Sequence, residues 1–389
     1  MPGASGFPRR AAAIAGIGST EFSKDSGQST FGLAARAIKA AVTDAGLQLT
    51  DVDGLATFGT GDSVPPNVLA QGLGIRSMNY YVDQYLGGSV GLSVVGSASL
   101  AVAAGVADCV VCYRALNGRS EQRLNGQGIK AKQPWDVQYK TSTGYVVPAQ
   151  EMGMAARAHM ERFGTTNEDF GRLAIMCRTH ASDNERAMMR TPITMDDYLA
   201  SPWISEPFRR LDCCLETDGA VALVIVNADR ARDLPHRSVL LQGAAWGGGV
   251  SLYTSATDLS DSPAFPIADR LFRAAGLGPA DLDFAELYDC FTYTLLSQIE
   301  GYGLAEPGGV PDMLRDGAFD RSTGQLPVNT HGGLLSEGYL HGFNHVYEAV
   351  QQIRGEAEHR QVERHDTALV AGQLGYISAY SSALVLAGA

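Results

Sequence analysis

The chain alternates between short runs of apolar, often β-branched residues and longer stretches in which apolar residues recur with helical spacing. Residues 11–18 form the first apolar run and are expected to be a buried strand. In residues 30–45, apolar side chains recur at i, i+3, i+4 and i+7, which predicts an amphipathic helix. Further along we expect strands at 52–58 and 108–113 and, between them, a helix at 88–104 that is apolar on nearly all sides. This alternation predicts an α/β fold, with parallel strands covered by helices on both faces.

One local pattern occurs twice along the chain. Ala45-Gly-Leu followed by Asp51-Val-Asp recurs as Ala275-Gly-Leu followed by Asp281-Leu-Asp, with the same internal spacing. A predicted helix precedes each copy and a predicted strand follows it. The pattern is typical of a duplicated α/β unit, although a common helix-to-strand connector would produce the same short match.

The length of 389 residues fits two packed halves better than one ordinary domain. We place the halves at 1–235 and 236–389. The segment at about 115–206 is more polar and is interpreted as a loop and helical insertion in the first half. Hydrophobic residues make up 45% of the chain, which is enough for a sizeable core.

Charge and cysteine content exclude several classes of protein. The formal net charge of -12 repels polyanions, so nucleic-acid binding is not expected. No apolar run approaches the roughly 20 residues of a membrane span, and no signal peptide is recognisable. Six scattered cysteines are too few for a disulfide framework in a chain of this size. We therefore expect a cytoplasmic protein.

The sequence lacks the residue spacings that are typical of common cofactor and metal sites. Cys109-Val-Val-Cys112 lies in a predicted strand, where positions i and i+3 point to opposite faces, and no second pair is nearby. His331, His341 and His345 lie close in sequence, but no carboxylate–His pattern completes a zinc site, so no metal is expected. The glycine-rich pieces do not match a dinucleotide fingerprint.

Four segments carry the strongest functional signal: Tyr85-Leu-Gly-Gly-Ser-Val-Gly91, Thr217-Asp-Gly-Ala220, Glu286-Leu-Tyr-Asp-Cys-Phe291 and the glycine-rich stretch 332–341. In this order, and with the duplication, the chain resembles the thiolase superfamily over nearly its whole length. Within it, the sterol-carrier or lipid-transfer-protein type is the most similar. The resemblance implies a thiolase-like fold. In that fold two βαβαβαββ halves form α/β/α/β/α layers with an inserted loop domain, usually in a homodimer.

The chain departs from the thiolase pattern at both catalytic cysteines. Counted back from the end of the buried helix, the nucleophile position falls on Gly88, and the second cysteine position falls on about Leu369, shortly before Gly375. Ser89 is a poor substitute because no base is identifiable beside it. Without a thiolate, the usual acyl-enzyme cannot form.

The motifs that bind the thioester oxygen in thiolases also differ in this chain. Tyr288 stands where thiolases have an Asn or His, and Tyr339 stands where they have the His of a Gly-His motif. Two phenols are therefore expected at the thioester oxygen, with Tyr293 as a third candidate and with His341 and Asp289 tuning them. A phenol can donate a hydrogen bond or act as acid or base. This pattern resembles the steroid side-chain retro-aldolases, a branch of the same thiolases.

Retro-aldol cleavage needs a base for the hydroxyl, an acid for the carbanion and donors at the thioester oxygen, but no nucleophile. The resemblance implies cleavage of a steroid side-chain β-hydroxyacyl-CoA to a 17-ketosteroid and propionyl-CoA. An example is 17-hydroxy-3-oxo-pregnene-20-carboxyl-CoA. It also implies an OB-fold partner from the associated hydratase and no cofactor, because coenzyme A is part of the substrate. Two alternatives stay open: another acyl-CoA carbon–carbon bond enzyme, such as an acetyl-CoA acetyltransferase, and a non-catalytic acyl-CoA or lipid-binding protein.

Overall fold

The computed structural model describes residues 6–121, 135–248, 258–373 and 380–389. Within these residues, nine strands form one mixed sheet. The strands are β1 (Ala12–Ser19), β2 (Gly54–Gly59), β3 (Tyr80–Tyr85), β4 (Cys109–Asn117), β7 (Asp218–Asn227), β8 (Val239–Gly248), β9 (Phe284–Leu287), β10 (Thr367–Gln373) and β11 (Tyr380–Gly388). Their order is β3-β2-β4-β7-β1-β8-β11-β10-β9. The first five strands in this order come from the first half of the chain and the last four from the second half.

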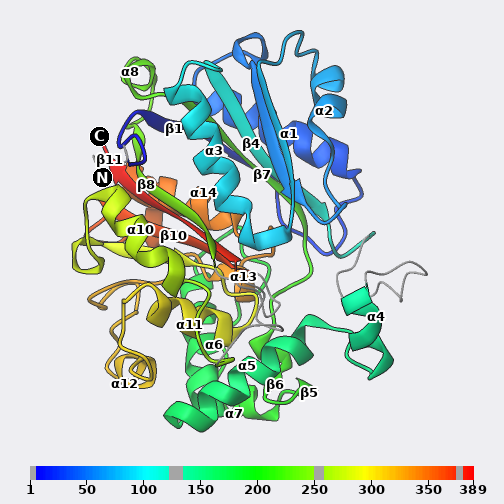
Figure 1. The fold of residues 1–389 in the computed structure, drawn as a ribbon, viewed down its shortest axis with the longest axis vertical. Coiled ribbons are helices and arrows are strands. Elements are labelled where there is room, and N and C mark those ends of the chain that lie inside the picture. The colour runs from blue at the N-terminus through cyan, green and yellow to red at the C-terminus, as the bar shows by residue number, and fades with distance from the viewer. Residues whose placement is uncertain (1–5, 122–134, 249–257, 374–379) are drawn as a thin grey trace.

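The two parts of the sheet meet where β1 runs antiparallel to β8. Only Ala13 with Leu240 and Ile14 with Val239 pair across this junction. Four helices then define the layers: α1 (Thr30–Asp44), α3 (Gly91–Ala103), α10 (Phe265–Ala275) and α14 (Phe343–Arg354). Helix α1 covers β1, β7 and β4 on one outer side, and α10 covers β8 and β11 on the other. Helices α3 and α14 contact strands of both parts, so they lie between them, which gives the expected α/β/α/β/α layers (Figure 1).

The repeated sequence pattern takes the same local structure twice. Helix α1 ends before Gly46, which has φ +69°, and a short 3₁₀ turn then leads into β2. Helix α10 ends at Gly276, which has φ +68°, and a matching turn leads into β9. Glycine adopts this left-handed conformation without steric cost, which is why it terminates both helices. The second unit differs in one respect, since Val328 forms only an isolated bridge with Ala285 where the first unit has a full strand.

The insertion lies between β4 and β7 at one end of the molecule (Figure 1). Its expected start at 115 falls inside β4, because residues up to Asn117 pair with β7 as far as Asp218. The insertion elements are α4 (Trp135–Ser142), α5 (Pro148–Phe163), α6 (Asn167–Ala181), α7 (Met195–Ala200), β5 (Trp203–Ser205) and β6 (Phe208–Arg209). Two of its helices, α5 and α6, pack against the second half of the chain, at α11 (Thr292–Gly301), α12 (Val310–Arg315) and α13 (Gly333–Ser336). The division of the chain at residue 235 stays a prediction.

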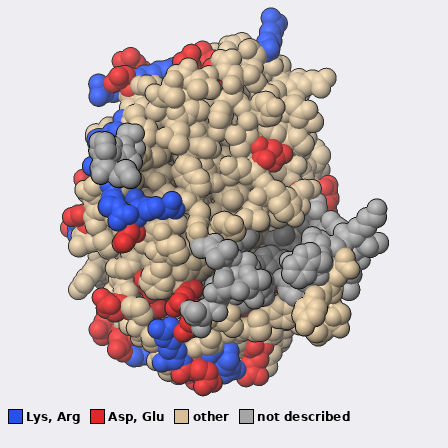
Figure 2. All heavy atoms as spheres, in the orientation of Figure 1, with Lys and Arg blue, Asp and Glu red and all other residues tan. Residues whose placement is uncertain are grey.

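Surface charge is unevenly distributed over the face drawn in Figure 2. Charged side chains of both signs gather at the insertion end and along one edge, while most of the area over α3 and its neighbouring strands is uncharged.

Two short helices complete the described α-helices, α2 (Pro66–Leu73) and α8 (Ala228–Ala231). Among the described residues, no helix is both long and apolar enough to cross a membrane.

Candidate active site

Two tyrosines from distant parts of the chain meet in the interior. Tyr288 follows the end of β9, and Tyr339 lies in the loop between α13 and α14. Their hydroxyl oxygens are 2.8 Å apart, within hydrogen-bond distance, and either can be the donor. The two rings are in an edge-to-face arrangement with centres 6.2 Å apart. The structure therefore joins the two phenols that sequence analysis singled out.

Burial governs the acidity of both phenols. It raises the pKa of Tyr288 well above its ordinary value, and the neighbouring Tyr339 adds to this effect. Burial likewise raises the pKa of Tyr339, but the hydrogen bond from Tyr288 and the positive charge of Arg114 act in the opposite direction. The ionised form of both phenols is therefore disfavoured, but only Tyr339 has neighbours that partly offset the effect of burial.

Gly88 makes room for the ring of Tyr288. It lies in a short 3₁₀ turn that leads into α3, and it is buried. A Cβ at this position would lie 2.3 Å from the Tyr288 ring and 2.4 Å from its hydroxyl oxygen. No side chain, cysteine included, fits at residue 88 while Tyr288 occupies this place.

The assignment of about Leu369 to the position of the second thiolase cysteine stays a prediction. Leu369 is buried on β10 and pairs with Ala285 and Val385. The residue beside Gly88 is Gly372, where a Cβ would lie 2.6 Å from the Gly88 carbonyl oxygen. Leu369 is three residues back along the strand, roughly 10 Å away, with its side chain on the opposite face. The other residue expected here, Gly375, lies outside the described residues.

Ser89 is not arranged as a nucleophile. Its hydroxyl donates a hydrogen bond to the carbonyl oxygen of Leu86, at 3.0 Å. It is buried, and among the described residues its hydroxyl forms no hydrogen bond to a base. Tyr293 also lies apart from the phenol pair, since its hydroxyl donates to the carbonyl oxygen of Ser260 and its ring packs near His159 and Phe170 of the insertion.

His341 lies beside Tyr339, with ring centres 4.8 Å apart. Its Nδ1 accepts hydrogen bonds from the guanidinium of Arg114, at 3.0 Å from Nε and 2.9 Å from Nη2. Asp62 accepts from the same guanidinium at 2.7 Å. Sequence analysis missed Arg114 and Asp62; the available signal was an arginine inside an otherwise apolar strand.

Asp289, expected to tune the phenols, supports the loop that carries Tyr339. Its carboxylate accepts from the backbone N–H groups of Leu334 and Leu335, and it lies 3.3 Å from Nε2 of His345. A Cβ on Gly333 would lie 2.0 Å from this carboxylate, so the loop needs glycine there. Asp289 follows Tyr288 in the chain, so its hydrogen bonds hold the loop that carries Tyr339 against the segment that carries Tyr288.

Behind the phenols, the fold assembles a carboxylate–histidine group that sequence spacing did not reveal. Ligand atoms of Glu286, His331 and His345 lie within 4.8 Å of one another, so these side chains could together hold a metal ion. Nδ1 of His331 is 2.9 Å from Glu286, and its Nε2 is 3.4 Å from Glu337. The neighbouring carboxylates raise the pKa of His331 to about 9 against the effect of burial. We interpret the group as a buried ion-pair network.

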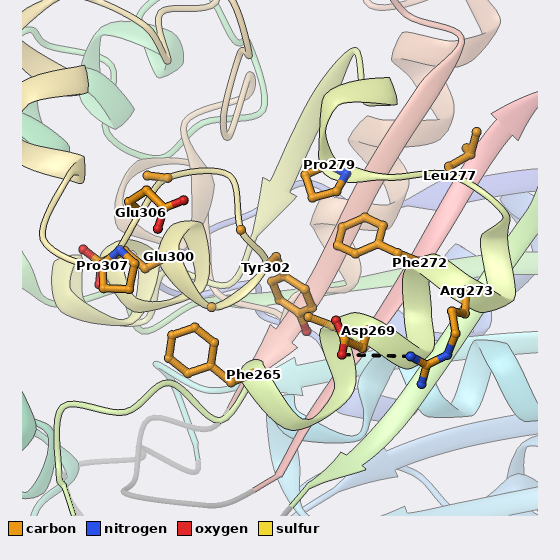
Figure 3. A pocket seen from close by; sticks show the side chains of 14 residues that line it. Phe265, Asp269, Phe272, Arg273, Leu277, Pro279, Glu300, Tyr302, Glu306 and Pro307 are labelled. Carbon is orange, nitrogen blue, oxygen red and sulfur yellow. Dashed lines mark ion pairs between the residues drawn. The ribbon is translucent and has the colours of Figure 1, made fainter.

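A surface pocket of about 710 Å³ lies elsewhere, between α10 and the end of α11 (Figure 3). Phe265, Phe272 and Tyr302 line it, with the ion pair of Asp269 and Arg273 at its rim. None of the phenol-pair residues lines this pocket.

The chain is similar to known proteins over most of its length. Residues 250–387 match the thiolase C-terminal domain-like family. The chain is 42% identical over 375 residues to the steroid side-chain-cleaving aldolase of Thermomonospora curvata, covering 93% of this chain and 95% of that one. It is also 42% identical over 355 residues to the 17-hydroxy-3-oxo-4-pregnene-20-carboxyl-CoA lyase of Mycobacterium tuberculosis, covering 88% and 92%.

Solved structures give the same result. The Ltp2-ChsH2(DUF35) aldolase is similar with a TM-score of 0.90 and 40% identity, over 98% of this chain and 99% of that one. The human mitochondrial 3-ketoacyl-CoA thiolase has a TM-score of 0.71 at 15% identity, over 97% and 99%, and shows the fold alone. The chain is therefore a thiolase-fold protein, as the sequence predicted. It belongs to the family of steroid side-chain-cleaving aldolases and is an aldolase, a carbon–carbon lyase.

Proposed function

We propose that this aldolase cleaves 17-hydroxy-3-oxo-4-pregnene-20-carboxyl-CoA, or a close steroid relative, to a 17-ketosteroid and propionyl-CoA. The observation that carries the proposal is the hydrogen-bonded phenol pair of Tyr288 and Tyr339, set against Gly88 where a thiolase nucleophile would be. The similarity to the 17-hydroxy-3-oxo-4-pregnene-20-carboxyl-CoA lyase of Mycobacterium tuberculosis supports the substrate class. The enzyme would serve steroid degradation, including cholesterol side-chain removal.

The proposed reaction balances without a covalent intermediate. A base takes the proton of the tertiary hydroxyl at C17, and the C–O bond becomes the ketone as the C17–C20 bond breaks. The electron pair of that bond forms the enolate of the thioester, which an acid protonates at C20 to give propionyl-CoA. Two acid–base groups and a donor for the enolate oxygen are the requirements.

Within the pair, we propose Tyr339 as the base and Tyr288 as the acid. The support is the asymmetry of their surroundings, because Arg114 and the hydrogen bond from Tyr288 favour the ionised form of Tyr339 only. At 2.8 Å the two oxygens can pass a proton directly. We also propose that Asp289 holds this geometry through the loop and that no cofactor takes part.

A homodimer and an OB-fold partner are part of the proposal. The edge strand β3 exposes Tyr81 and Tyr85, at 70% and 74%. The solved relative named as an Ltp2-ChsH2(DUF35) aldolase supports a second chain of the DUF35 class. All six cysteines are free, which fits the reducing cytoplasm.

The test is product analysis of the chain co-expressed with its OB-fold partner. With the 17-hydroxy steroid CoA ester, we expect equal amounts of propionyl-CoA and ketosteroid, with about 10²–10⁴-fold lower kcat in Tyr288→Phe and Tyr339→Phe. Tyr302→Phe is the matched control, since Tyr302 is equally buried but hydrogen-bonds to Ser381. An ester that binds without being cleaved would favour a binding protein, and cleavage to other acyl-CoA products would favour a different carbon–carbon bond reaction.

A further inference from the structure

A fully buried cation, the guanidinium of Arg114, contacts His341. Arg114 is on β4 and has no exposed surface. Its guanidinium is 2.7 Å from Asp62 and 5.4 Å from the centre of the Phe58 ring, and its Nη1 donates to the carbonyl oxygen of Ala115 at 3.2 Å. A buried charge costs free energy unless it is paired and hydrogen-bonded, and this one is both.

The hydrogen bonds of Arg114 determine the tautomer of His341. A guanidinium has donors but no acceptor, so the Nδ1 that it faces must carry a lone pair. The ring proton of the neutral imidazole is then on Nε2. Burial, followed by the charge of Arg114, lowers the pKa of His341 to about 3, so the ring stays neutral over the physiological range.

The local backbone is shaped around this arrangement. His341 has φ +52°, a conformation that is uncommon for a residue with a side chain and that tends to occur at functional positions. At the end of β2, a Cβ on Gly59 would lie 2.6 Å from Oδ1 of Asp62 and 3.4 Å from Nη1 of Arg114. Asp62 can therefore pack against the end of this strand in its present position only with glycine at residue 59.

We propose that Asp62 and Arg114 are positioning residues that fix His341 as a neutral hydrogen-bond donor for the oxyanion developing on the thioester oxygen. The proposal rests on the retro-aldol function proposed above. When the C17–C20 bond breaks, negative charge moves to that oxygen, and a fixed N–H stabilises it without giving up its proton. His341 does not act as the base, because its one lone pair already accepts from Arg114.

Two substitutions of His341 separate a donor from a base. Glutamine places an amide N–H near the position of Nε2, whereas asparagine reaches only as far as Nδ1 and tolerates the left-handed backbone well. We expect His341→Asn to lower kcat about 10²–10³-fold with little change in KM. We expect His341→Gln to recover most of that loss. If the two variants are equally active, whether both are impaired or both are close to wild type, the donor role is overturned.

A substrate-free measurement tests the role of Arg114 directly. In ¹⁵N-histidine NMR of the wild-type complex, His341 is expected to show protonated Nε2 and unprotonated Nδ1 from about pH 5 to 9. The double variant Asp62→Asn/Arg114→Met removes both charges together and leaves neither unpaired. In it, we expect the pKa of His341 to rise from its wild-type value, because the charge of Arg114 is gone while the burial remains, and we expect kcat to fall.

A wild-type ring that titrates near pH 6.5, or that carries its proton on Nδ1, would overturn the proposal whatever the substrate is. Unchanged kcat in a double variant in which the pKa of His341 does rise would do the same. If the wild type fails to cleave the steroid ester while the NMR result holds, the failure belongs to the proposed reaction rather than to the arrangement of Arg114 and His341.

Discussion

Gly88 and Tyr288 occupy one site that has room for only one side chain. A Cβ on Gly88 would lie 2.3 Å from two carbon atoms of the Tyr288 ring. The absence of a side chain at residue 88 and the position of the Tyr288 ring are therefore sterically coupled. Tyr288 can reach the hydroxyl of Tyr339 in this arrangement only while residue 88 is glycine.

Gly88→Ala is expected to lower both stability and activity. The added methyl forces the Tyr288 ring to move, and such overpacking costs about 1–3 kcal/mol. Thermal unfolding and kcat are the measurements, with Gly32→Ala as the control because a Cβ there has its nearest neighbour at 3.5 Å. Adding Tyr288→Leu should restore stability to Gly88→Ala but not activity. A stable, fully active Gly88→Ala enzyme would contradict the steric coupling.

The sequence predicted the fold class, the layers and the two phenols because these depend on local patterns and ordered motifs. The residues that lie beside Gly88 in the fold were harder to predict from the sequence. Gly372 lies beside Gly88, and the sequence did not indicate this contact because strand register within an apolar strand leaves no mark in a single sequence. The pairing of Arg114 with Asp62 likewise joins residues 52 apart, and only the folded sheet brings them together.

Cleavage is expected to proceed without an acyl-enzyme. Burial raises the pKa of the thiols, to about 12 for Cys109 and well above the ordinary value for Cys177 and Cys214, so thiolates are scarce at neutral pH. Iodoacetamide treatment of the native protein should leave most of the activity. Intact-protein mass spectrometry after rapid acid quench should show only the unmodified mass. An acyl adduct during turnover would refute this mechanism.

The rate should rise with pH through the neutral range. The pKa of both Tyr288 and Tyr339 lies above its ordinary value, mainly because of burial, so only a small fraction of the base is ionised. That fraction grows about tenfold per pH unit while pH stays below the pKa. The pH profile of kcat/KM measures it. A plateau beginning near pH 6–7 would instead indicate a histidine base.

Stability should depend on pH through the pair of Glu286 and His331. The folded pKa of His331 is raised to about 9, so its contribution is complete below about pH 6.5 and is lost as pH rises through 9. Opposing burial, His331 and His345 lower the pKa of Glu286 to about 2, so its contribution is complete above about pH 4.5 and is lost as pH falls through 2. Chemical unfolding from pH 5 to 9 should show falling stability on the alkaline side, and His331→Gln should flatten that decline. A wild-type curve as flat as that of the variant would contradict the network.

Self-association should depend on the edge strand β3. Its exposed residues are Tyr81, Asp83 and Tyr85, and the unpaired backbone groups of such an edge strand are a template for pairing with another strand. Two copies meeting edge to edge about a twofold axis would bury these rings. Tyr81→Lys/Tyr85→Lys is expected to shift the mass measured by light scattering from dimer to monomer, because charges on an edge oppose pairing. Tyr139→Lys, at a tyrosine 76% exposed on α4, is the matched control and should remain dimeric. A double variant that stays dimeric would place the interface on another surface.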